Sequence, residues 1–449
     1  MKKAWKIFRA TVVVVLALLV TVPVGLYIIL STPWAQNKVR DVAVSELKAL
    51  LATDVEIGRV DIHPFNRVSI YDIQADDDNG RQALQISEIS VAFEFFHLLR
   101  TGHLMVDFAL VDGPDMQLYR QTPESPLNIA NIIARLKSDD KNRPKSRYDI
   151  QINTVIVRQG RFSYDLLSAP IKDEGFDRNH IHICDLRLNA YIPRISNEEY
   201  TVSVEHLSFN EKSGIEITNI LAYADIKADG ATLRRLSVEM PGTLLEFLPA
   251  SLKFDGIDQL TKAVLDQGLD IALSDESHIT PSDLSAFCTQ LSALDRQYAL
   301  GLSAHISGSS VRVDSVTVSD PDRSLRLAVR ASADSIRSGV NADFNLERLS
   351  LNMSGAEASM IASKFLPPQR PSSPISRLLS ARTISLSADA KGRVCDADFS
   401  VDLAADNNRV SIDGNYYSHD SLKNVRLDLI SALRLNLSLI HISEPTRPY

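Results

Sequence analysis

The segment ISVAFEF, residues 89–95, decides the fold class, because every second residue in it is large and apolar. In an extended chain, successive side chains point to opposite sides. Ile89, Val91, Phe93 and Phe95 therefore share one side, and the smaller or polar residues between them share the other. This pattern predicts a β-strand with one apolar face.

The same alternation recurs along most of the chain. Further strands of this kind are predicted at LRLNAYI (186–192), LRLAV (325–329), VNADFNL (340–346) and VRLDL (425–429). About twenty such runs lie between Val55 and Leu437, and Asp, Asn, Gly or Ser bounds most of them. Since no regular alternation of strands and helices accompanies them, the sequence predicts a mainly β, antiparallel fold.

Two of the runs change the side on which their apolar residues lie. The change falls between Ile86 and Ile89 in LQISEIS, and between Val313 and Val316 in VRVDSVTV. A slip of one residue is typical of a β-bulge, which bends and twists a sheet. We therefore expect a curled sheet and not a flat one.

Helical spacing is confined to a few segments. Residues 31–52 begin with Ser31 and Thr32, either of which can cap a helix, and an amphipathic helix is predicted over about residues 33–51. Three short helices are predicted farther along, over residues 128–136, 281–294 and 356–366.

The N-terminal region is typical of a membrane anchor. Residues 11–30 contain no charge, and as a helix they are about 30 Å long, enough to span a bilayer. Four cations precede them, which favours a cytoplasmic position for residues 1–10 and export of everything that follows. A cleaved signal peptide is the alternative, and it also exports the remainder.

Composition excludes several classes of protein. The 449 residues include 48 Lys and Arg and 56 Asp and Glu, a net charge of −8, so no basic surface for nucleic acid is expected. Cys184, Cys288 and Cys395 are too far apart in the sequence to indicate a zinc set or a disulfide framework. No cofactor is predicted.

Candidate chemical sites are few. His180, His182 and Cys184 share one side of a predicted strand and could bind a metal, although an ordinary polar strand face is the interpretation we favour. DDDNG, residues 76–80, resembles the start of a calcium loop but lacks a glutamate at its twelfth position, so a hairpin turn is predicted. Without catalytic motifs the chain is predicted not to be an enzyme. An exported hydrolase, recognisable by polar side chains that converge in a cleft, is the alternative.

The collective pattern is more informative than any single motif. Alternation over residues 53–437, with little helix to cover it, predicts one long curled and twisted sheet whose apolar face forms an elongated groove. Acyl chains suit such a groove. The candidate lipid-contacting residues are Ile89, Val91, Phe93, Phe95, Leu186, Leu188, Leu325 and Leu327. Two or three ordinary β-domains with closed cores are the alternative.

The first 136 or so residues resemble the N-terminal part of the TamB family, within the wider AsmA-like group of Gram-negative envelope proteins. The segments that carry the resemblance are STPWAQNKV (31–39), LLATDVEIGRVDI (50–62), FNRVSIYDIQADDDNGRQALQISEISVAFEFFHLL (65–99), HLMVDFALVDGPDMQLYR (103–120) and NIANII (128–133). The resemblance implies a single-pass inner-membrane protein with most of its mass in the periplasm. It further implies transport of phospholipid toward the outer membrane. The alternative is a subunit of a translocation and assembly module that assists the secretion or assembly of outer-membrane β-barrels with a TamA-like partner.

Residues 438–449, SLIHISEPTRPY, do not continue the β-pattern and resemble the translated read-through of a sequencing adapter. They are expected to be a non-native tail, and the chain is expected to be a fragment that lacks the C-terminal part that meets the outer-membrane partner. A genuine polar tail is the alternative.

Overall fold

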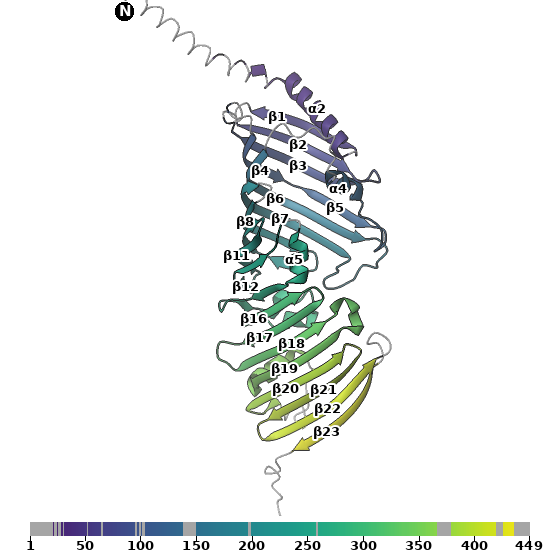
Figure 1. Cartoon of the computed structure of the whole chain (residues 1–449), viewed down its shortest axis with the longest axis vertical. Helices are drawn as coiled ribbons and strands as arrows, with labels where there is room; N and C mark the ends of the chain where they lie inside the picture. The colour runs from purple at the N-terminus through teal and green to yellow at the C-terminus, as the bar shows by residue number, and fades with distance from the viewer. Residues whose placement is uncertain are drawn as a thin grey trace, which may run out of the picture. The chain divides into compact units, whose positions relative to one another are not determined.

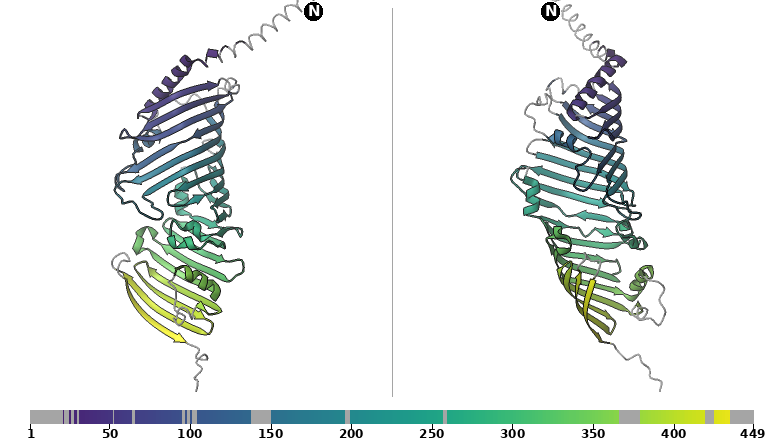
Figure 2. Two further views of the ribbon diagram at one scale, coloured as in Figure 1. Left: turned by 180° about the vertical axis from the view of Figure 1, so that it is seen from behind. Right: turned by 90° about the vertical axis from the view of Figure 1, so that its right-hand side faces the viewer.

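The protein is mainly β, with 58% of its residues in strands. The computed structural model describes residues 21, 25, 28–29, 31–51, 53–63, 66–94, 97, 100, 104–137, 150–195, 199–256, 259–365, 379–418 and 425–434. The chain divides into two compact units, Met1–Ala222 (unit 1) and Tyr223–Tyr449 (unit 2). In both units the sheet is curled, as Figure 2 shows.

Unit 1 consists of a long helix followed by a sheet (Figure 1, purple to teal). Its elements are α2 (Pro33–Leu51), β1 (Val55–His63), β2 (Arg67–Asp76), β3 (Gln82–Phe93), β4 (Leu104–Asp112), β5 (Asp115–Arg120), α4 (Ala130–Lys137), β6 (Ile150–Leu166), β7 (His180–Ile195), β8 (Glu199–Glu211) and β9 (Glu216–Ile217). The boundary between the units lies within β10 (Asn219–Lys227).

The sheet of unit 1 is antiparallel except at β6. Strands β4 and β5 both pair with β3, and both run parallel to β6. The chain between β5 and β6 contains α4, and this crossover returns the chain in the direction in which β5 ran. The prediction of an antiparallel sheet is therefore wrong at this one position and confirmed for the other strand pairs described in unit 1.

Unit 2 begins with short strands and ends in a regular meander (Figure 1, teal to yellow). The first part consists of β11 (Gly230–Glu239), β12 (Leu244–Phe247), β13 (Ala250–Lys253), α5 (Leu260–Asp266), β14 (Leu269–Ala272), β15 (His278–Ile279), η2 (Pro281–Leu284) and η3 (Thr289–Ala293). The meander consists of β16 (Tyr298–Ser307), β17 (Ser310–Ser319), β18 (Leu325–Asp334), η4 (Ile336–Asn341), β19 (Asp343–Ser354), α6 (Gly355–Phe365), β20 (Thr383–Arg393), β21 (Asp396–Ala405), β22 (Asn408–Ser418) and β23 (Val425–Arg434).

Most of the predicted helices are present. Helix α2 covers Pro33–Leu51 as predicted, and the Thr32 hydroxyl caps it by accepting a hydrogen bond from the Ala35 N–H at 3.3 Å. Helices α4 and α6 also match their predictions. Residues 281–294 instead form two short 3₁₀ helices, and α5 was not predicted.

The two predicted β-bulges have different outcomes. Between Val313 and Val316 the register of β17 shifts against both of its neighbours, so that bulge is confirmed. Between Ile86 and Ile89 the register with β2 is constant, so that bulge is wrong. Asp72 of β2, opposite this position, has a positive φ of 54°. This left-handed residue reverses the side on which the neighbouring side chains lie without adding a residue to either strand.

The structure tests the predicted strand over residues 340–346 and the predicted terminal segments only in part. In VNADFNL, Phe344 and Leu346 belong to β19, but the first residues belong to η4, so the predicted strand begins too early. The predicted anchor over residues 11–30 falls mostly outside the described residues, as does all of the predicted tail over residues 438–449. Among the residues that are described, no helix is both long and apolar enough to cross a bilayer.

Candidate functional site

The strand registers of unit 1 align apolar residues into continuous rows on one face of the sheet. Directly paired residues on neighbouring strands share a face. One row consists of Val60, Ile70, Ile89, Val111, Val157, Leu188 and Leu207. The next consists of Ile62, Val68, Val91, Ala109, Val155, Ala190 and Val204. We call these two rows the apolar face of unit 1.

Unit 2 has a corresponding surface with three rows, which we call the apolar face of unit 2. The first row is Leu300, Val318, Leu327, Leu351, Leu386, Leu403 and Val410. The second is Leu302, Val316, Val329, Leu349, Ala388, Val401 and Ile412. The third is Ala304, Val313, Ala331, Leu346, Ala390 and Phe399.

Bulges keep these rows on one side of the sheet. Strand β17 has an extra residue between Val313 and Val316, and β19 has one between Leu346 and Leu349. At each bulge, three residues thus occupy the place of two. The apolar residues before and after the bulge therefore point to the same side of the sheet. The slips in the sequence pattern are therefore what keeps the face apolar.

Most side chains of the apolar faces are partly exposed. In unit 1 only Val60 and Ala190 are buried, and in unit 2 only Ala304. On β18, Leu327 and Val329 are partly exposed, and so is Ala328, which lies on the opposite side of the strand. A packed second layer would bury Leu327 and Val329 and leave Ala328 open. Neither side of this strand is covered in that way.

The helices cover only parts of these surfaces. Ala43, Val44 and Leu47 of α2 pack on a buried cluster in β1–β3 that includes Ile57 and Val60. In unit 2, Ala358 of α6 packs beside Ala381, Ile384 and Ala405, next to the first row. A third cluster, around Leu252, Phe254 and Ala263, lies at α5. The compact cores described in the two units thus coincide with the helices.

The predicted lipid-contacting residues fall into three groups. Ile89, Val91 and Leu188 lie in the rows of unit 1, and Leu327 lies in the first row of unit 2. Phe93 and Leu186, both partly exposed, pair with Val106 and Gly160 on the neighbouring strands, and Leu325 is buried, with 8% exposure, beside the first row of unit 2. Phe95 lies outside the described residues. The structure does not test whether any of them contacts lipid.

Sequence reasoning missed most of the row partners. Ile70, Val111, Val157 and Leu349 occupy central places in the rows, yet none was singled out. The alternation around each of them was visible in the sequence. Their alignment into rows was not, because it depends on register across strands that lie far apart in the chain.

The strongest polar cluster in unit 1 joins β6 to β7. His180 Nδ1 lies 2.8 Å from Asp165 Oδ1, and His180 Nε2 lies 3.2 Å from the Ala169 carbonyl oxygen. Both partners only accept hydrogen bonds, which suits a ring protonated on both nitrogens. The hydrogen bond to Asp165 raises the pKa of His180 above its usual 6.5, against the opposing effect of burial. The second histidine, His182, also contacts Asp165, with 3.2 Å between Nε2 and Oδ1.

This cluster braces the loop between β6 and β7. His180 is buried, His182 is partly exposed and Cys184 is exposed, and within the described part of the chain no group of three or more such ligands could hold a metal ion. Asp177 secures the same loop by accepting hydrogen bonds from the N–H groups of Lys172 and Asn179, at 3.0 Å each.

The predicted turn at residues 76–80 is confirmed. It links β2 to β3, and Asp77 Oδ1 accepts hydrogen bonds from the N–H groups of Asn79 and Arg81 at 2.7 and 2.9 Å. Such bonds from an aspartate to the backbone just after it are typical of a tight turn.

The stability of unit 1 is expected to depend on the charge of His180. Because its folded pKa is raised, the stabilisation is fully present below pH 6.5 and is lost as the pH rises through the folded pKa. Denaturation of the full chain should be monitored by hydrogen exchange at the amide groups of the β6–β7 loop. We expect this loop to open more often as the pH rises above 6.5. His180→Gln should remove this dependence, while His63→Gln, at an exposed histidine, should keep it. A wild-type profile that is flat from pH 6 to 9 would contradict the assignment.

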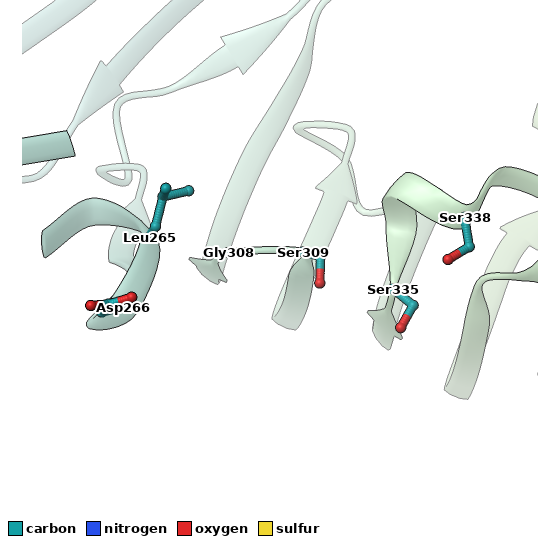
Figure 3. A pocket seen from close by; sticks show the side chains of 6 residues that line it. All are labelled: Leu265, Asp266, Gly308, Ser309, Ser335 and Ser338. Carbon is teal, nitrogen blue, oxygen red and sulfur yellow. The ribbon is translucent and has the colours of Figure 1, made fainter. Parts of the chain in front are cut away.

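Unit 2 also has a shallow hollow of about 400 Å³. Leu265, Asp266, Gly308, Ser309, Ser335 and Ser338 line it. Figure 3 shows its polar side chains spread along the hollow and not gathered at one point. A nucleophile needs a base within hydrogen-bond reach, and Asp266, the one ionisable side chain among the described residues of the lining, forms no hydrogen bond with any of the three lining serines. The hollow therefore gives no support to a hydrolase.

Comparison with protein-family models, with curated proteins and with solved structures found no match for this chain.

Proposed function

We propose that this protein is a membrane-anchored, non-enzymatic lipid carrier whose apolar faces act as a groove for the acyl chains of phospholipids. The observation that carries the proposal is the set of unbroken apolar rows whose side chains stay partly exposed. In a closed β-domain these side chains would form the core. Here they form a surface that water contacts, and an acyl chain would displace that water.

The size of the apolar face of unit 2 supports this proposal. Seven strands about 4.8 Å apart extend for about 30 Å, and three rows two residues apart extend for about 14 Å along the strands. The resulting area, on the order of 400 Å², is comparable to the largest apolar patch on a typical monomer, which is often functional. Each methylene group buried there contributes about 0.8 kcal/mol, so a long acyl chain is a suitable ligand.

The side of the meander opposite the apolar face also supports the proposed lipid carrier, because it faces water. Many of its exposed residues are polar or charged, among them Arg312, Asp314, Thr317, Arg326, Arg330, Arg348, Asn352, Ser387, Asp389, Lys391, Asp398 and Asp413. A sheet that is apolar on one side and charged on the other can hold lipid on the first and remain soluble through the second.

The cellular setting of the proposal comes from the sequence. The uncharged segment over residues 11–30 and the resemblance to the TamB family support a location in the inner membrane of a Gram-negative bacterium, with the sheets in the periplasm. The direction of transport would then be toward the outer membrane, and a TamA-like barrel would be the partner at the far side.

Lipid retention by the full chain tests the proposal. The protein should be extracted in mild detergent and examined by native mass spectrometry, and mass additions that correspond to phospholipid are expected. Lipid supplied in excess should increase the number bound per chain. A protein that carries no phospholipid and takes none up would contradict the proposal.

A second candidate function, the assembly of outer-membrane barrels, is favoured by the edge of unit 2. Strand β23 pairs with β22 over ten residues, and within the described part of the chain no strand pairs with its other side. Leu427, Leu429 and Ile430 are 56%, 55% and 77% exposed. A long, unpaired apolar strand can accept another strand by β-augmentation.

A substitution in β23 distinguishes barrel assembly from lipid transport. Ile430→Pro removes a backbone N–H from β23 and leaves the rows of β16–β21 unchanged. If barrel assembly is the function, the variant should lose barrel insertion in cells yet still retain phospholipid. If lipid transport is the function, lipid retention and transfer should both persist.

A further inference from the structure

Helix α2 has one side that packs on the sheet. Ala43, Val44 and Leu47 contact the cluster in β1–β3. This side accounts for the amphipathic pattern that predicted the helix. An ordinary surface helix would present polar residues on its other side.

The other side of α2 is not polar throughout. Trp34, Lys38 and Val42 follow one another at intervals of four residues, and Ser45 and Ala49 continue the same line along the helix. All five are exposed, Trp34 by 74% and Val42 by 53%. This line along the helix therefore combines two exposed apolar side chains, Trp34 and Val42, with the cation of Lys38.

The exposed apolar surface continues toward the N-terminus. Ile28 and Ile29 are 60% and 57% exposed, and they belong to the uncharged segment over residues 11–30. Val39 on the flank of α2 adds a further exposed apolar side chain, at 39%. The exposed side of α2 is therefore contiguous in sequence with the segment that the proposed function places in the bilayer.

We propose that α2 lies along the surface of the bilayer, with Trp34 and Val42 inserted at the boundary between headgroups and acyl chains. Tryptophan prefers this boundary, because its ring is apolar and its N–H can still find a hydrogen-bond acceptor. Lys38, between Trp34 and Val42 on the same line, suits anionic headgroups. The inference rests on the proposed membrane anchor.

The position of α2 has a consequence for the sheet. The side of α2 opposite Trp34 packs on Ile57 and Val60 of β1, where the rows of unit 1 begin. A helix that lies flat on the bilayer would hold this end of the apolar face within reach of the outer leaflet of the inner membrane. Acyl chains could then pass from the leaflet to the first row without crossing bulk water.

Tryptophan quenching by lipid tests this inference. The full chain should be reconstituted in vesicles of phosphatidylethanolamine and phosphatidylglycerol in which part of the lipid has brominated acyl chains. Trp5→Phe leaves Trp34 as the single tryptophan. In a background of Trp5→Phe and Trp34→Phe, Val42→Trp and Ala49→Trp move the probe along the helix, and Ile171→Trp places it in an exposed loop as a control.

A flat helix predicts comparable quenching along its length. Ala49 lies 49 − 34 = 15 residues beyond Trp34, so a helix that led away from the bilayer would carry it about 22 Å farther out. We expect blue-shifted emission at all three helix positions, with quenching after Val42→Trp and Ala49→Trp at least about half of that at Trp34. The Ile171→Trp control should remain unquenched. Quenching confined to Trp34 would overturn the inference.

Two other outcomes would also overturn the inference. A blue shift that depends on protein concentration and not on lipid would assign this side of α2 to a second copy of the chain. Red-shifted, unquenched emission at every position would leave it in water. These failures differ from a failure of lipid binding, because native mass spectrometry of the detergent-extracted chain reads lipid on the apolar faces regardless of how α2 is oriented.

Discussion

Leu327→Asp is expected to reduce phospholipid transfer at least about tenfold while the protein remains folded. A charge in the first row of unit 2 must lose water when an acyl chain passes over it, and a penalty of about 1.4 kcal/mol already corresponds to a factor of ten. Because Leu327 is partly exposed, the aspartate keeps access to water in the lipid-free protein. The expected loss in the free energy of unfolding is therefore only about 1–2 kcal/mol. Transfer between donor and acceptor vesicles, together with urea denaturation, measures both effects.

The adjacent residue provides the matched control. Ala328 is also partly exposed, on the same strand, but its side chain lies on the opposite side of the sheet. Ala328→Asp introduces the same charge and should leave transfer within about twofold of the wild type. If Leu327→Asp instead unfolds unit 2, the residue belongs to a closed core, and the interpretation of an open surface is wrong.

Arg296→Ala is expected to cause the largest loss of stability in unit 2. Arg296 Nη2 lies 3.2 Å from Asp320 Oδ2, and Nη1 lies 3.0 Å from Glu357 Oε2. The Asp320 side chain is fully buried and that of Glu357 is 6% exposed. Removal of the guanidinium leaves two buried carboxylates without their cation. Since Arg296 is itself 38% exposed, we expect a loss near the lower end of the usual range, about 3 kcal/mol.

An exposed ion pair on β17 is the control for this variant. Arg312 Nε lies 3.1 Å from Asp314 Oδ1, with both side chains more than half exposed. Arg312→Ala should cost less than about 1 kcal/mol in the free energy of unfolding. Equal losses for the two variants, measured by denaturant titration of the full chain, would contradict the role assigned to Arg296.

The same cluster should make unit 2 sensitive to acid. Burial opposes ionisation of Asp320, but hydrogen bonds from the Ser324 hydroxyl and the Leu325 N–H, with Arg296 nearby, outweigh burial and lower the pKa of Asp320 below 3.8. A lowered folded pKa stabilises the protein above the unfolded pKa, and this contribution is lost as the pH falls through the folded value. In Arg296→Ala the loss should begin at a higher pH.

Local features of the fold could be predicted from the sequence. The bounds of α2 follow from helical spacing and from Thr32, and the bulge between Val313 and Val316 follows from a slip in the alternation. Both signals are contained within a few neighbouring residues. The side on which each apolar residue lies could be predicted for the same reason.

Features that depend on distant residues could not be predicted. The parallel pairing of β4 with β6 joins segments separated by a crossover, and alternation gives no indication of strand direction. The ion pair between Arg296 and Glu357 links residues 61 positions apart. The positive φ of Asp72 imitates a bulge in the sequence pattern, because both devices reverse the side of the next side chain. None of these features is written in the local alternation, because each depends on how the assembled chain brings distant segments together.

The surface proposed to bind lipid could be recognised only from the sequence pattern and the strand registers together. Alternation predicted an apolar face, but only the registers align Leu327 with Leu351 and Val157 with Leu188 into continuous rows. Their partial exposure then distinguishes an uncovered surface from a closed core. Neither observation alone would support a carrier of acyl chains.

Site-specific photo-cross-linking in cells tests the central claim most directly. A benzophenone amino acid should be incorporated in place of Leu349, on the apolar face of unit 2, and separately in place of Ser350, its neighbour on the opposite side of β19. The account predicts phospholipid adducts at Leu349 and none at Ser350. Absence of lipid at Leu349, with cross-links to other segments of the same chain in its place, would show that the apolar face is covered and would contradict the account.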